Sequence, residues 1–106
     1  MDNRIDAAID IARAERETLR WIILTALWHG RPYGVNEYVL QMTSRDIPLR
    51  VTADQVRSEL ASLEKRGLVK VGRDGPIWWG ELTADGEAVV DYRSPAPIDI
   101  ARPRKW

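Results

Sequence analysis

The segment from Thr52 to Gly67 constrains the fold of this chain most strongly, because the sequence marks both ends of a helix there. Thr52 and Gln55 match a capping box, in which the threonine hydroxyl accepts from the Gln55 amide and the glutamine side chain bonds back to the cap residue. Gly67 is a natural residue just beyond a helix end, where the chain often turns left-handed. We therefore predict a helix that begins at Ala53 and ends before Gly67.

The apolar side chains of this helix indicate which face is buried. Val56, Leu60 and Leu63 lie within about 60° of one another on a helix, so they are expected to face the core. The opposite face carries only small or polar side chains, and we call it the outer ridge. Its members are Asp54, Ser58, Ala61, Ser62 and Lys65. Such a ridge would let the helix backbone approach the floor of a DNA groove, and the alternative is a solvated helix face.

Residues 5–29 are predicted to form one long helix, or two helices in line, because apolar residues recur there at heptad-like spacing. Over residues 19–28 the apolar side chains surround the helix, which predicts the buried central helix of the domain. The charged N-terminal half has only a narrow apolar stripe of Ile5, Ile9 and Ala12. We expect this half to project and to pair with a second copy, so these three residues are assigned to a homodimer interface.

The remaining elements are predicted from helix caps, prolines and β-prone runs. They are a turn over 29–34, a short helix capped by Asn36 over 37–42, a connector over 44–51 whose end at 49–51 could form a brief strand, a β-hairpin with arms 68–73 and 77–82, and a last helix capped by Thr83 over 84–92. After Ser94, three prolines favour an extended arm over a packed element. The prediction is a mainly α domain with a small β-hairpin (α+β) over 1–94, followed by an extended basic arm over 95–106.

Composition removes several classes of function. The chain has no cysteine, so it has no disulfide, no thiolate zinc site and no cysteine nucleophile. The apolar run around residues 21–28 is far shorter than the roughly 20 residues that span a bilayer, and acidic residues stand near the N-terminus where a signal peptide is basic. No phosphate-binding glycine loop, metal-ligand set or nucleophile and base arrangement is visible, and the single histidine, His29, stands at a helix end. We expect a cytoplasmic protein that is not an enzyme, with no cofactor, no metal and no membrane partner.

The predicted order of helix, helix, helix, hairpin and helix resembles a winged helix-turn-helix. The run SELASLEKRGLV, which begins at Ser58, and the later run ELTADGEAVV are similar to the ArsR, MarR and PadR types of winged-helix regulator. RWIILTAL, YGVNEYVL and the Arg-Pro tail also resemble small ArsR-like winged-helix proteins of Mu-like prophages. The resemblance covers most of residues 19–104 and implies a DNA-binding transcription regulator. Metal sensing is not implied, because this chain lacks the cysteines of the metal-sensing members.

The positive charge that DNA binding needs must be local, because 16 basic and 16 acidic residues cancel. The tail over 93–106 holds four basic residues against one acidic residue, and the hairpin offers Lys70 and Arg73. The residues assigned to DNA are Thr52, Asp54, Gln55, Arg57, Ser58, Ser62, Lys65, Lys70, Arg73, Arg102, Arg104 and Lys105. Solvated surface charge is the alternative for the hairpin cations and for the ridge.

Two functional hypotheses follow. The favoured one is sequence-specific binding of double-stranded DNA by a homodimer that regulates transcription of phage or host genes. The other is a winged-helix module that binds protein, for example in phage assembly, which would suit the zero net charge and an exposed tryptophan. Trp78 and Trp79 are adjacent in a predicted strand, so their side chains should point to opposite faces. For both we favour core packing or docking of the tail over base stacking.

Overall fold

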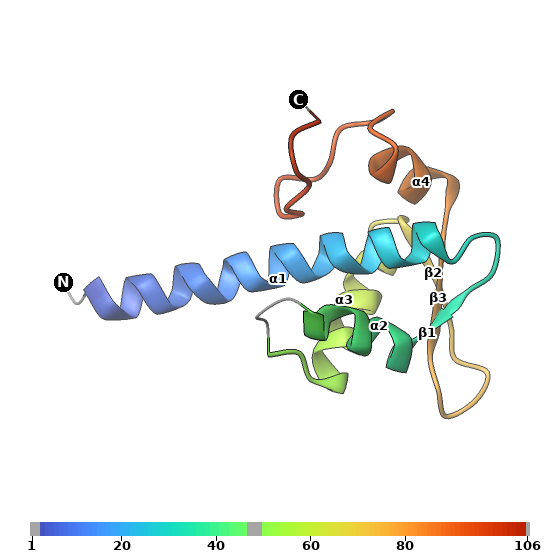
Figure 1. Ribbon diagram of the computed structural model, residues 1–106, viewed down its shortest axis with the longest axis horizontal. Helices are drawn as coiled ribbons and strands as arrows, with labels where there is room; N and C mark the ends of the chain where they lie inside the picture. Colours follow the sequence, from blue (N-terminus) through green and yellow to red (C-terminus); the bar gives the residue numbers. More distant parts are fainter. Residues whose placement is uncertain (1–2, 47–49, 106) are drawn as a thin grey trace.

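The computed structural model describes the backbone of residues 3–46 and 50–105 and the side chains of residues 10–45 and 50–105. This described part is a mixed α+β domain with four α-helices, a 3₁₀ turn and a three-stranded antiparallel sheet (Figure 1). In chain order the elements are α1 (Asn3–His29), β1 (Val35–Asn36), α2 (Glu37–Thr43), the turn η1 (Ser44–Asp46), α3 (Ala53–Lys65), β2 (Val69–Gly72), β3 (Trp79–Leu82) and α4 (Ala84–Val90).

Helix α1 is one continuous helix whose two halves have different surroundings. Leu19, Ile23, Leu24 and Leu27 are at most 4% exposed and belong to the hydrophobic core. Residues 10–14 are exposed, and Figure 1 shows the N-terminal half of the helix extending beyond the rest of the molecule. The predictions of a buried central helix and of a projecting N-terminal half are both confirmed.

Helix α3 begins and ends where the sequence predicts. Both bonds of the capping box are present, from the Gln55 amide to Thr52 Oγ1 (3.1 Å) and from the Thr52 amide to Gln55 Oε1 (2.8 Å). At the other end, Gly67 has a φ of 74°, and the amide of Leu68 donates to the Leu63 carbonyl at 3.1 Å, as in a Schellman motif. Val56, Leu60 and Leu63 are fully buried, so the predicted rotation of this helix is confirmed.

The sheet contains a strand, β1, that the sequence did not predict. The strands lie in the order β1-β3-β2, and β1 pairs with β3 through Val35 opposite Gly80 and Asn36 opposite Trp79. The brief strand expected at 49–51 is not found: Leu49 lies outside the described residues, and Val51 is in no strand. Asn36 both ends β1 and caps α2, because its side chain accepts from the Val39 amide at 3.0 Å.

The predicted hairpin and last helix are present, and glycines allow them to pack closely. A Cβ at Gly72 would lie 1.8 Å from the indole of Trp79, so this ring covers the glycine. Thr83 caps α4 by accepting from the Gly86 amide at 3.1 Å. A Cβ at Gly86 would lie 2.1 Å from the Leu68 carbonyl oxygen, so the glycine that weakens this helix by propensity is required for its contact with the chain before β2.

The C-terminal segment corrects the expectation of an unpacked arm. It has no helix or strand, but Ile100 is only 5% exposed and joins the hydrophobic core. The Ala101 amide donates to the Glu17 carbonyl of α1 at 3.1 Å, and the Tyr92 hydroxyl donates to the Pro103 carbonyl at 2.6 Å. In Figure 1 this segment and α4 lie on the side of α1 opposite α2. The Ile100 side chain, the Ala101 backbone bond and the Tyr92 side chain therefore help to hold the segment against the domain.

Candidate nucleic-acid interface

The outer ridge of α3 faces away from the core. Asp54, Ser58 and Lys65 are exposed, while Ala61 and Ser62 are half-buried. None of the five is large and apolar, so no side chain on the ridge prevents a close approach of the helix backbone. The predicted ridge is therefore a real surface, held in place from the opposite face by fully buried side chains.

The capping box already uses the side chain of Gln55. Its Oε1 accepts from the Thr52 amide, so a bidentate contact to a base would require the cap to open. Gln55 and Ser58 also line a pocket of about 180 Å³ between α3 and the projecting half of α1, together with Arg16 and Arg50. Thr52 is likewise engaged in the cap. The exposed ridge residues near the start of the helix are Asp54 and Ser58.

Arg57 is held by groups inside the molecule. Its Nε donates to the carboxylate of Glu37 at 2.9 Å, and its Nη2 donates to the Pro76 carbonyl at 2.9 Å. Glu37 is buried and accepts a further bond from the Trp78 amide at 2.7 Å. Arg57 therefore joins α2, α3 and the hairpin loop, and the DNA contact predicted for it has a competing structural role.

The two predicted hairpin cations have different environments. Arg73 makes two hydrogen bonds to Glu64, at 3.0 and 2.9 Å, and its guanidinium lies 4.3 Å from the centre of the Trp78 ring. This pairing lowers the pKa of Glu64 and raises the pKa of Arg73. Lys70 is exposed on β2, opposite Glu81 of β3.

The predicted cations of the tail do not join this surface. Arg102 donates to the carbonyls of Val89 and Ser94, both at 2.8 Å, and its guanidinium lies over the ring of Tyr92. Arg104 and Lys105 are exposed. In Figure 1 the tail lies on the other side of α1 from α2 and the hairpin loop, so these three residues do not lie beside the hairpin cations.

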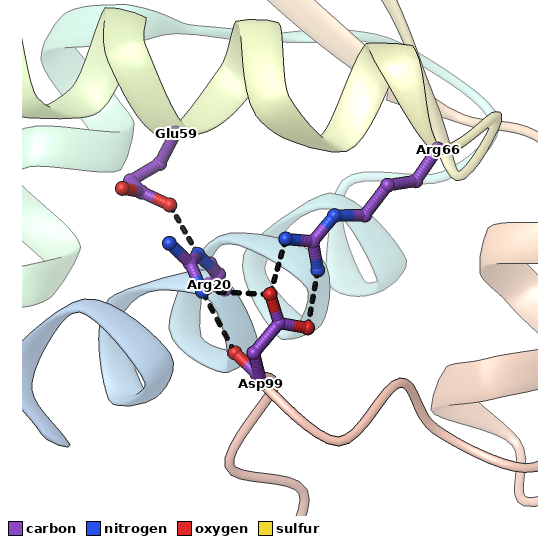
Figure 2. A network of polar contacts seen from close by, with 4 residues as sticks. All are labelled: Arg20, Glu59, Arg66 and Asp99. Atoms are coloured by element: carbon purple, nitrogen blue, oxygen red, sulfur yellow. Dashed lines mark hydrogen bonds and ion pairs between the residues drawn. The ribbon is translucent and has the colours of Figure 1, made fainter. Parts of the chain in front are cut away.

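A polar network that the sequence analysis missed fixes α3 against α1 and the C-terminal segment (Figure 2). Glu59, only 6% exposed, accepts from Arg20 Nε, and Arg20 Nη1 donates to the Asp99 carbonyl at 2.9 Å. Arg66 forms two hydrogen bonds with the Asp99 carboxylate, which lower the pKa of Asp99. The available signal was a charged residue among apolar ones, since Arg20 falls at the start of the apolar portion of α1.

The predicted dimer interface is only partly described. Ala12 is exposed, but the side chains of Ile5 and Ile9 lie outside the described ones. Among the described residues, no group of three acidic or histidine side chains could hold a metal ion. Within the same ranges, no helix combines the length and apolar character that a bilayer crossing needs.

Comparison with protein-family models, with curated proteins and with solved structures found no match. What this chain binds must therefore be inferred from its own residues and their arrangement.

Proposed function

We propose that this chain is a winged helix-turn-helix domain that binds double-stranded DNA as a non-enzymatic, cytoplasmic transcription regulator. The observation that carries the proposal is the outer ridge of α3, an exposed helix face of small and polar side chains beside a β-hairpin. A helix with such a face fits the major groove, and a neighbouring hairpin reaches the adjacent backbone.

The contacts that hold α3 in place favour a role in base recognition, because base recognition requires a helix in a fixed position. The capping box fixes its first turn, and the pair between Arg57 and Glu37 fixes it to α2 and the hairpin loop. The network through Arg20 and Asp99 fixes its other flank. In this arrangement Ser58 would meet base edges, and Lys65, two turns later, would meet phosphate.

The charge pattern limits how strongly the proposed surface would bind DNA of arbitrary sequence. Arg57 and Arg73 are paired with carboxylates, so the exposed positive charge near α3 and the hairpin comes from Lys65, Lys70 and Arg50, which stands just before α3. Few phosphate contacts imply a shallow dependence of affinity on salt. Specific binding would then depend on two copies acting together on a two-fold symmetric site.

Selection of bound fragments from a random duplex pool tests this proposal. We expect enrichment of a palindrome, whose symmetry would also report the dimer. Selection with a Ser58→Ala variant should relax one position in each half-site. Wild-type protein that enriches no sequence would contradict the proposal.

The second candidate is a protein-binding module, and a specific observation favours it. Tyr38, Val39 and Met42 of α2 are 54%, 41% and 54% exposed, so they form an apolar face close together on a short helix. If the random pool gives no enrichment, this face is the surface to test first. Tyr38→Ser and Met42→Ser should then abolish binding of a protein partner without unfolding the domain.

A further inference from the structure

Two arginines lie over the same indole ring at the base of the hairpin loop. The guanidinium carbon of Arg57 is 4.7 Å from the centre of the Trp78 ring, and that of Arg73 is 4.3 Å from it. Stacking on an aromatic face orients a guanidinium without using its N–H donors. Two oriented guanidinium groups therefore lie at this place, one from α3 and one from the hairpin. Their carboxylate partners decide whether each is available to an outside anion.

Arg57 is unavailable to an outside anion. The side chain of its partner Glu37 is 6% exposed and also accepts from the Trp78 amide. Withdrawing Arg57 would leave a buried carboxylate without its cation, which is strongly unfavourable. The role of Arg57 is to fix the base of the loop.

Arg73 is in the opposite situation. Its side chain and that of Glu64 are 39% and 38% exposed, and an ion pair in contact with water contributes little net stability. The two parallel bonds that it makes to a carboxylate can equally be made to a phosphate. If Glu64 rotated away, Arg73 could stay on the Trp78 ring, so the exchange needs no rearrangement of the hairpin.

We infer that Arg73 contacts a phosphate of duplex DNA and that Glu64 is its internal competitor, occupying the guanidinium in the free protein and releasing it in the complex. This inference rests on the proposed function. The Glu64 carboxyl is charged at neutral pH even at its ordinary pKa, and the hydrogen bond from Arg73 lowers that pKa further. Because the exchange is equally costly on every DNA sequence, Glu64 would weaken specific and non-specific binding by the same factor and leave discrimination to the outer ridge.

Titration of the full chain with a fluorescent duplex of random sequence at low salt tests the inference. The proteins compared are the wild type, Glu64→Gln, Arg73→Ala and the double variant. Glu64→Gln should tighten binding about three- to five-fold, the size expected when an exposed ion pair no longer has to be broken. Arg73→Ala should weaken binding, and in that background Glu64→Gln should lose its effect.

Asp91→Asn is the matched control, because Asp91 forms an exposed pair with Arg93 at the end of α4. It removes the same charge away from the hairpin, so it reports the effect of net charge alone. The inference would be overturned if Glu64→Gln tightened binding no more than Asp91→Asn does. It would also be overturned if the full effect of Glu64→Gln persisted without Arg73. Thermal unfolding confirms that each variant is folded. If the wild type binds no duplex at low salt, the proposed function is contradicted as well. If it binds and Glu64→Gln leaves the affinity unchanged, only the role of Glu64 as competitor is contradicted.

Discussion

Ser58 and Lys65 lie on the same ridge of α3 but should meet different parts of DNA. Ser58 is in the second turn, which in the proposed complex would lie close to the bases, and Lys65 is the last residue of the helix, where a phosphate would be nearer. Ser58→Ala should therefore cost roughly 1–3 kcal/mol on the preferred site and little on random duplex. Lys65→Ala should weaken binding to both by a similar factor. Fluorescence anisotropy with the two duplexes measures each effect.

Lys105→Ala is the matched control for Lys65→Ala. Both lysines are exposed, but the Nζ of Lys105 lies 5.8 Å from the centre of the Tyr92 ring, whereas Lys65 is on α3 itself. Affinity for random duplex should therefore change less in Lys105→Ala than in Lys65→Ala. An equal loss in the two variants would contradict the assignment of phosphate contact to the end of α3.

Local signals were sufficient for some site residues and insufficient for others. The capping box of Thr52 and Gln55 spans three residues, so its geometry follows from the sequence alone. The partner of Arg57 is 20 residues away, and the partners of Asp99 are 33 and 79 residues away. Which carboxylate neutralises which arginine depends on the tertiary fold, so the sequence predicted Arg57 as a site residue but not its pairing, and it did not reveal the network around Asp99.

At the scale of the element, helix propensity and packing have opposite preferences at Gly86: propensity favours alanine, and packing requires glycine. Alanine in place of a helical glycine usually adds about 1 kcal/mol of stability. Here a Cβ would lie 2.1 Å from the Leu68 carbonyl oxygen and 2.9 Å from a methyl group of Leu82. Gly86→Ala should therefore destabilise the domain by about 1–3 kcal/mol in urea unfolding, despite the better propensity.

Gly75→Ala provides the comparison for this variant. A Cβ at Gly75, in the hairpin loop, would meet no atom within 4 Å. The free energy of unfolding of Gly75→Ala should change little or rise slightly, because alanine restricts the conformations of the unfolded chain. If Gly86→Ala were as stable as Gly75→Ala, α4 would not pack on the chain before β2 as closely as the structure shows.

The helix ends could be predicted from the sequence and strand β1 could not, because the interactions that form them differ in range along the chain. Caps and terminal glycines act within a few residues, so α2, α3 and α4 begin where the sequence indicates. The two residues of β1 become a strand only because β3 lies beside them, 45 residues later at Val35 and Gly80. The packing of the proline-containing tail likewise depends on α1, which the local composition does not reveal.

At the scale of the whole molecule, Asp99 links α1, α3 and the C-terminal segment. The pKa of its carboxyl is lowered from 3.8, mainly by the hydrogen bond from Arg66. A carboxylate with a lowered folded pKa adds stability that is present above the unfolded pKa and is lost as pH falls through the folded pKa. Asp99→Asn should therefore lower the free energy of unfolding at pH 7, and this difference should shrink below about pH 4. Urea unfolding of both proteins at neutral and acid pH measures it, and a difference independent of pH would contradict the charge link.

We expect the projecting half of α1 to determine whether the molecule is a monomer or a dimer. A helix of 27 residues is about 40 Å long, and only its C-terminal half is covered by the domain. Because Ile5, Ile9 and Ala12 form one stripe, we expect two copies to pair through it. Light scattering at micromolar concentration should then give twice 12.1 kDa.

Two aspartate substitutions on this half of the helix test the stripe itself. Ile9→Asp places a charge within it and should give a monomer. Ile11→Asp is the matched control, because Ile11 is 59% exposed and lies about 130° around the helix from the stripe. It should leave the dimer intact. A monomeric wild type, or dimers that survive Ile9→Asp, would contradict pairing through α1, and a palindromic DNA site would then need another interface to explain its symmetry.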